Sequence, residues 1–262
     1  MTAVRLPVTG MDVRLRLPAG ADDLVLLEAG PPDLAVALAF LGRVVRRAGG
    51  EPLDAASLPI GDVDALLLRL RQKIAGDTIS GEALCATPGC RARVDVTFSI
   101  AAYLDHHRPS TPASASPADE GGWHRLGDTR VEFRLPTADD QLATVHAPEP
   151  EQVLLRRCVR PAGITAAERA EAEAAMEAMA PSLFSDLEGR CPACDATVEI
   201  RFDPLEYALR ELRDQAAFVY HDVSAIARCF HWSEAEILAL PAARRARYAE
   251  LAAAQHGWQE GS

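Results

Sequence analysis

The sequence predicts an α+β protein that consists of an internally duplicated unit and a helical C-terminal extension. Three observations lead to this fold class: motifs that recur in the same order, two short turns that each carry a pair of cysteines, and a final segment with an almost continuous helical pattern. The chain has 262 residues, of which 48% are hydrophobic, so it is long enough to bury a substantial core.

The first two recurring motifs are a short strand and the end of a helix. Residues 13–18 (VRLRLP) resemble residues 131–136 (VEFRLP), which lie 118 residues later, and two aspartates follow each stretch. Residues 40–49 resemble residues 154–163, which lie 114 residues later, and each stretch reads as a helix that stops at glycine. These matches indicate that one structural unit occurs twice.

The closest match begins at the second cysteine of each turn. Residues 90–98 (CRARVDVTF) align without gaps on residues 194–202 (CDATVEIRF), 104 residues later, and Tyr103 aligns with Tyr207 at the same separation. Both stretches alternate apolar and polar residues, as half-buried strands do. The separation falls from 118 to 114 to 104 along the chain, so we expect the second copy to be a shortened version of the first.

The matches also divide the chain into predicted domains. The first repeat spans residues 1–107 and the second spans residues 123–204, each with one cysteine turn. Residues 108–122 (RPSTPASASPADEGG) are rich in Pro, Ser, Ala and Gly, a composition that cannot bury enough apolar surface to fold alone, so we predict a flexible linker. Residues 205–262 have no counterpart in the first repeat and form the predicted helical extension.

Four of the six cysteines form two close pairs, Cys85 with Cys90 and Cys191 with Cys194. Pro or Gly inside each turn lets two thiolates face one ion, and a strand follows each turn. Zinc in structural sites takes four tetrahedral ligands, so each turn supplies half of a site. The sequence therefore predicts one structural zinc ion per chain, held by all four cysteines in a zinc-ribbon-like site that joins the two repeats. A thiol redox pair at Cys191 and Cys194 is the alternative.

The helical extension offers aromatic, apolar and basic side chains to a protein partner. Ser233 and Glu236 form a capping box, and Pro241 begins the last helix. A nucleic-acid-binding regulator that uses these helices is the alternative, but residues 219–250 hold four arginines and four acidic residues, whereas DNA readers are usually basic. The candidate partner-binding residues are Tyr220, Phe230, Trp232, Leu240, Arg244 and Arg245.

Composition narrows the function classes further. The net charge of −11 makes nucleic acid and anionic membranes unfavourable partners. The first twenty residues lack the apolar core of a secretory signal, no stretch is long enough to cross a bilayer, and paired cysteines in a reducing compartment indicate metal ligation, so we expect a cytoplasmic protein. The motifs of serine hydrolases, phosphate-binding loops and dinucleotide-binding folds do not occur, so we expect no enzymatic activity and no catalytic residues.

Further motifs surround the first cysteine turn and the C-terminal helices. Residues 58–62 (LPIGD), residues 66–71 (LLLRLR) and the Cys85 turn together resemble the T-even phage type of baseplate hub assembly chaperone. Residues 219–248 are similar to small helical proteins and tails of contractile injection systems. The resemblance implies a non-enzymatic assembly chaperone or structural component of a phage-tail-like baseplate, which acts by binding other tail proteins.

Overall fold

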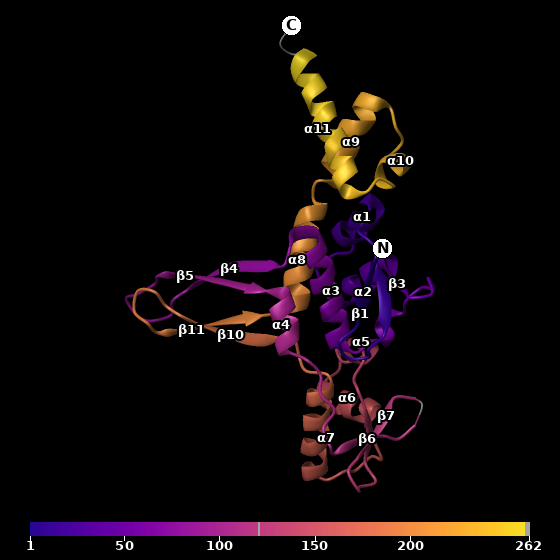
Figure 1. Ribbon diagram of the computed structural model, residues 1–262, viewed down its shortest axis with the longest axis vertical. Coiled ribbons are helices and arrows are strands. Elements are labelled where there is room, and N and C mark those ends of the chain that lie inside the picture. Colours follow the sequence, from indigo (N-terminus) through magenta and orange to yellow (C-terminus); the bar gives the residue numbers. More distant parts are fainter. Residues whose placement is uncertain (120, 260–262) are drawn as a thin grey trace. The chain divides into compact units, whose positions relative to one another are not determined.

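The computed structural model of the protein describes residues 1–119 and 121–259 (Figure 1). The chain forms two compact units. The first unit comprises residues 1–4, residues 13–53 and the described residues from 205 onward, and the second comprises residues 5–12 and 54–204. Among the described residues, no helix has the length and apolar character needed to cross a bilayer.

The first unit combines a three-stranded sheet, in the order β1-β2-β3, with helices from both ends of the chain. α2 begins where the side chain of Asp33 accepts a hydrogen bond from the backbone of Val36. The elements are β1 (Thr2–Arg5), β2 (Asp12–Leu15), α1 (Gly20–Glu28), α2 (Leu34–Val44), β3 (Val45–Arg47), α8 (Pro204–Ala216), α9 (Val219–Phe230), α10 (Glu234–Leu238) and α11 (Ala242–Gln259).

The second unit contains a four-stranded antiparallel sheet, in the order β6-β7-β8-β9, and two separate antiparallel hairpins, β4-β5 and β10-β11. A mixture of helices and small antiparallel sheets is what the sequence predicted. The elements are η1 (Ala55–Ser57), α3 (Ile60–Ala75), β4 (Thr78–Leu84), β5 (Arg93–Ser99), α4 (Ile100–His106), β6 (Ala115–Pro117), β7 (Trp123–Leu126), β8 (Glu132–Arg134), α5 (Ala138–Leu142), α6 (Pro150–Cys158), β9 (Val159–Arg160), α7 (Ala166–Met179), β10 (Ser185–Arg190) and β11 (Thr197–Phe202).

A strand–helix–helix–strand arrangement occurs once in each unit. β2, α1, α2 and β3 form what we call the first motif, and β8, α5, α6 and β9 form the second motif. The two strands of each motif are antiparallel and have the same register: Leu15 lies opposite Val45, and Phe133 lies opposite Val159. These are residues that the sequence comparison places 118 and 114 positions apart.

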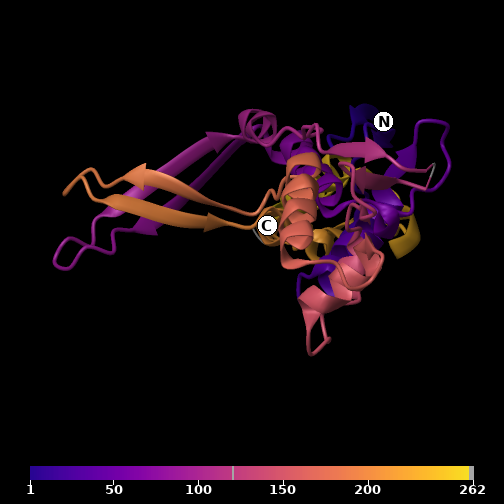
Figure 2. The same ribbon diagram turned by 90° about the horizontal axis from the view of Figure 1, so that it is seen from below.

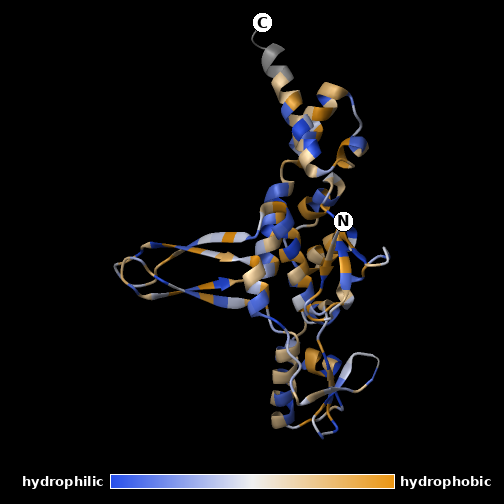
Figure 3. Cartoon of the chain, in the orientation of Figure 1, coloured by the Kyte–Doolittle hydropathy of each residue, from blue (hydrophilic) through white to orange (hydrophobic). Residues whose placement is uncertain are grey.

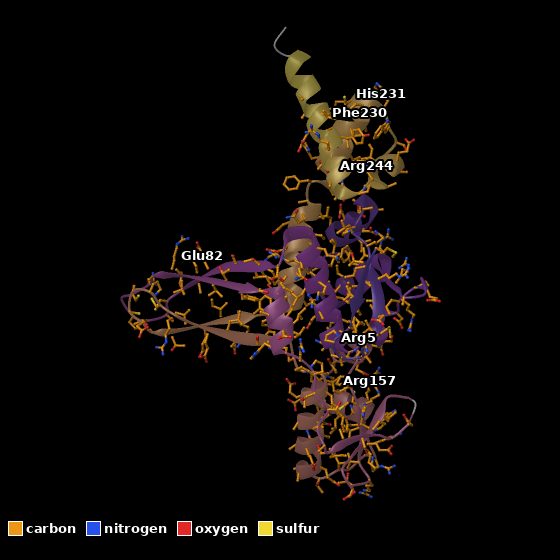
Figure 4. The ribbon with its side chains drawn as sticks, in the orientation of Figure 1. Arg5, Glu82, Arg157, Phe230, His231 and Arg244 are labelled. Atoms are coloured by element: carbon orange, nitrogen blue, oxygen red, sulfur yellow. The ribbon has the colours of Figure 1, made fainter. Side chains whose placement is uncertain are left out.

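A buried aspartate at the start of the shorter helix ties the second motif together. The side chain of Asp140 accepts hydrogen bonds from Arg134 on β8, at 2.5 and 2.8 Å, and from Arg157 on α6, at 2.6 Å. Arg157 is labelled in Figure 4. Burial alone raises the pKa of Asp140, but the bonds from Arg134, Thr137 and Arg157 outweigh it and hold this pKa well below its usual range. The first motif contains the same arrangement with the corresponding residues Arg16, Asp22 and Arg43.

A Leu-Pro pair before a long helix packs on each motif. In the second unit, the carbonyl of Leu58 accepts a hydrogen bond from the first backbone N–H of α5 at 2.8 Å, and Pro59 forms a β-bridge with Thr137. In the first unit, Pro241 forms the corresponding bridge with Ala19 before α11. Each Leu-Pro pair follows one motif in the sequence and packs on the other.

The compact units consequently differ from the predicted sequential domains. Residues 54–107, expected in the first repeat, belong to the same unit as residues 123–204, and the predicted extension belongs to the unit of the first motif. The reason is that both Leu-Pro segments cross over to the other motif. Local sequence patterns do not show which segment packs on which repeat, so this exchange could not be predicted from the sequence.

The predicted flexible linker, residues 108–122, also needs correction. Within it, Ala115 lies in strand β6 and is buried in one cluster with Phe133. The backbone N–H of Ser110 donates a hydrogen bond to the carbonyl of Ala178 at 2.8 Å. The linker is therefore anchored in part, because β6 pairs with β7 and its small Ala115 side chain packs in the core of the same sheet.

Candidate metal centre

Two hairpins, β4-β5 and β10-β11, lie side by side in the second unit (Figures 1 and 2). Polar and apolar residues alternate along the strands of both hairpins (Figure 3). The apolar sides include Val94 and Val198, which are buried in one cluster. At the other end of the strands, the rings of Phe98 and Phe202 pack edge to face with 5.1 Å between centroids. The strands thereby aim both cysteine turns at the same point.

The four predicted cysteines meet where the two turns face each other. The Sγ atoms of Cys85 and Cys194 are 3.6 Å apart, and those of Cys90 and Cys191 are 3.7 Å apart. All four sulfurs lie within 4.8 Å of one another. Each short distance joins one hairpin to the other, so the cluster connects the two hairpins and not only the ends of one turn.

These distances fit a single tetrahedral ion. Four sulfurs at the Zn–S bond length of about 2.3 Å lie about 3.8 Å from one another, close to the separations of 3.6 and 3.7 Å. A disulfide needs about 2.05 Å, and all four thiols are free. The arrangement can hold a metal ion with four thiolate ligands, which leaves no open position on a tetrahedral ion.

The two turns share their backbone geometry although their lengths differ. The backbone N–H of Cys85 donates to the carbonyl of Ala92 at 2.9 Å, and that of Cys191 donates to the carbonyl of Ala196 at 2.9 Å. Ala92 and Ala196 are aligned in the sequence comparison. The two extra residues of the first turn are thus accommodated between the cysteines, without changing how the strands leave the site.

The environment of the thiols favours a bound cation. Hydrogen bonds from the side chain and backbone of Thr87 lower the pKa of Cys85 to about 6. The backbone of Ala92 favours the Cys90 thiolate, but the neighbouring thiols and burial outweigh it and raise the pKa of Cys90 to about 12. Four thiolates in one place repel each other, and a divalent cation removes this conflict.

Each turn also holds a non-glycine residue in the left-handed backbone region directly after its second cysteine. These residues are Arg91, at φ 49°, and Asp195, at φ 57°. A side chain in this region costs about 1 kcal/mol relative to glycine.

We expect Arg91→Gly to raise the free energy of unfolding by up to about 1 kcal/mol without loss of the bound metal. Relief of the left-handed strain is the cause. Thermal unfolding with a metal assay measures both quantities. Ala92→Gly in the same turn, where φ is not positive, is the matched control and should lower stability by about 0.5–1 kcal/mol. Equal effects of the two substitutions would contradict the assignment of strain to Arg91.

The structure separates the predicted partner-binding residues into two groups. Phe230 and Trp232 are half-buried and form an aromatic cluster with Tyr248, with 4.9 Å between the centroids of Trp232 and Tyr248. Leu240 is also half-buried. Tyr220 and Arg244 are exposed, and Figure 4 shows Arg244 on α11.

Arg245 does not reach the surface, which corrects the expectation that it meets a partner. Its guanidinium donates to Asp23 at 2.7 Å and to Asp222 at 3.0 Å. The side chain is 3% exposed and both aspartates are 9% exposed. Arg245 instead joins α1 to α9 and α11, because two buried carboxylates need a cation.

The sequence missed Thr87, which bonds to the cluster from inside the longer turn. Its hydroxyl lies 3.8 Å from the Sγ atom of Cys194. A threonine between paired cysteines is a recognisable signal, since a hydroxyl can donate to a thiolate.

Comparison of the chain with protein-family models, with curated proteins and with solved structures finds no match.

Proposed function

We propose that the chain is a non-enzymatic, zinc-stabilised protein that acts by binding other proteins. The observation that carries this proposal is the four-sulfur cluster at the junction of two hairpins, in which each hairpin contributes two thiols. Four thiolates fill the coordination sphere of zinc, so the ion stabilises the structure and offers no site to a substrate or an activated water. The two turns and their shared backbone geometry support a zinc-ribbon-like arrangement.

We also infer that the chain arose by internal duplication. The same register of paired strands occurs in the two motifs, and so does the same arginine–aspartate–arginine cluster. Both motifs also receive a Leu-Pro segment at the same position. Three independent features at aligned residues are difficult to explain by chance similarity of Leu-rich and Arg-rich segments.

The partner class follows from the resemblance stated above. We propose an assembly chaperone or structural component of a phage-tail-like contractile baseplate, whose partners are other tail proteins. The exposed side chains of Tyr220 and Arg244 on the C-terminal helices are candidate contacts. The alternative is a nucleic-acid-binding regulator. It is weakened because Arg245, one of the basic residues of the C-terminal helices, is buried against two aspartates and does not face a nucleic acid.

Co-expression of the full chain with the tube, spike or hub protein of a contractile tail tests the proposal. We expect one of them to co-elute with the chain at a fixed ratio. The double variant Tyr220→Ala with Arg244→Glu should reduce the amount of tail protein that co-elutes by about tenfold. Phe184→Ala, an exposed aromatic in the other unit, is the control and should leave the complex intact.

Two other results would contradict the proposal. A salt-dependent shift of DNA by the purified chain, without capture of any tail protein, would favour the regulator. Reversible conversion of Cys191 and Cys194 to a disulfide in metal-free protein would favour a thiol redox enzyme, and differential alkylation followed by mass spectrometry measures it.

A further inference from the structure

The second unit contains a cavity of about 640 Å³ beside the second motif. It is lined by α5, α6 and α7 and by the first residue of α3. Its apolar lining includes Ile60, Leu154, Leu155 and Met176. This volume and lining suit the side chains of one face of a helix better than an ion.

The corresponding face of the first motif is covered by the chain itself. Pro18, Asp23 and Leu26 are all buried there, with Leu26 at 1% exposure. Asp23 accepts a hydrogen bond from Arg245, which also binds Asp222 of α9. Two helices therefore cover this face of the first motif: α9, which carries Asp222, and α11, which carries Arg245.

The second motif leaves the same positions uncovered. The residues aligned with Pro18, Asp23 and Leu26 are Pro136, Gln141 and Thr144, and all three line the cavity. None of them is buried. The short η1 precedes the Leu-Pro pair of the second unit, where the longer α9 and α10 precede that of the first, so no helix of the described chain takes the place of α9.

The charge of the cavity lining determines which kind of partner the cavity favours. Among the described residues that line the cavity, the charged ones are Glu151, Arg169, Glu173 and Glu177. Arg169 pairs with Glu151 at 3.2 Å and with Glu173 at 2.7 Å, which leaves an excess of negative charge. A basic partner is therefore favoured over an acidic one.

We propose that this cavity is a docking groove for an amphipathic helix of a partner protein, with apolar residues on one face and Lys or Arg beside them. The inference deepens the proposed function, because it rests on the chain being a protein-binding scaffold. The helix would occupy the second motif as α9 occupies the first. Its basic residues would meet the glutamates at the rim of the groove.

Fluorescence anisotropy with synthetic helical peptides tests the groove in the full chain. One labelled peptide of about 16 residues carries Leu at helical spacing and flanking Lys, and a second replaces every Lys with Glu. In buffer of about 50 mM salt, where surface charges are little screened, we expect the Lys peptide to bind at least about tenfold more tightly. We expect Glu151→Lys with Glu173→Lys to remove this preference.

Two groove variants and one control locate the binding. Leu154→Asp places a charge in the apolar lining, and Thr144→Trp fills the groove from a half-exposed position that the core does not need. Each should weaken the Lys peptide about tenfold or more. Val145→Asp, next to Thr144 but 60% exposed and outside the groove, should leave binding unchanged.

Equal binding of the Lys and Glu peptides, or full binding by Thr144→Trp, would overturn the groove. Self-association of the wild type that Leu154→Asp abolishes would assign the face to a second copy and would overturn it as well. If the peptides fail while a tail protein still co-elutes, the groove is wrong and the proposed function stands. If the peptides bind while DNA alone is captured by the chain, the proposed function is wrong.

Discussion

Cys191→Ser is expected to abolish metal binding and to lower the free energy of unfolding of the second unit by several kcal/mol, a fall in Tm of about 10 °C or more. Cys191 is 2% exposed and its sulfur lies 3.7 Å from that of Cys90 on the other hairpin. A serine leaves three thiolates, which neither fill the coordination sphere nor keep the hairpins together. Native mass spectrometry and thermal unfolding measure the two effects.

The loss should also be local. Backbone amides of β4-β5 and β10-β11 should exchange with solvent faster in the variant, whereas those of the first motif should not change. Cys229→Ser is the matched control, since this half-buried thiol lies on α9, in the other unit from the cluster. If Cys191→Ser keeps one zinc per chain, or loses zinc without any change in Tm, the ion has no structural role.

Asp140→Ala should lower the free energy of unfolding by about 3 kcal/mol, because it leaves two guanidinium groups beside each other without their carboxylate. The side chain of Asp140 is fully buried, while those of Arg134 and Arg157 are 23% and 39% exposed. Because Arg157 is partly exposed, solvent screens its interaction with Asp140 and reduces its contribution to stability. The expected loss of about 3 kcal/mol is therefore at the low end for a broken buried ion pair. Denaturant unfolding of both proteins measures the difference.

Asp139→Ala is the control for this substitution. Asp139 is 64% exposed and pairs with Arg157 at 2.7 Å, so its loss should cost less than about 1 kcal/mol. An equal cost for the two aspartates would contradict the proposed importance of the buried cluster.

The pH dependence of the Asp140 contribution has a definite sign. The pKa of Asp140 is held well below its usual range in the folded protein, and an unfolded aspartate titrates near pH 3.9, at about its ordinary pKa. The unfolded state therefore takes up the proton first as pH falls. The stability difference between wild type and Asp140→Ala should be fully present above about pH 5 and should shrink progressively below about pH 4.

The sequence predicted the cluster of four cysteines more completely than it predicted the fold around it. Paired cysteines before aligned strands identify Cys85, Cys90, Cys191 and Cys194, because ligand type and spacing are local properties of the chain.

The tertiary arrangement depends on contacts between distant segments. The repeated pattern aligns Arg43 with Arg157. It does not predict their hydrogen bonds to Asp22 and Asp140, because tertiary packing decides which helix faces which strand. The sequence likewise suggested Arg245 as a contact for a protein partner. Nothing local to α11 reveals that Asp23, more than two hundred residues earlier, is buried beneath it.

X-ray absorption at the zinc edge, on full-length protein that carries one zinc per chain by native mass spectrometry, tests the metal centre most directly. The predicted result is a single shell of four sulfur ligands at about 2.3 Å, with no nitrogen or oxygen ligand. A shell that contains nitrogen or oxygen, or carefully prepared protein without zinc whose four thiols remain free and whose hairpins remain paired, would contradict it.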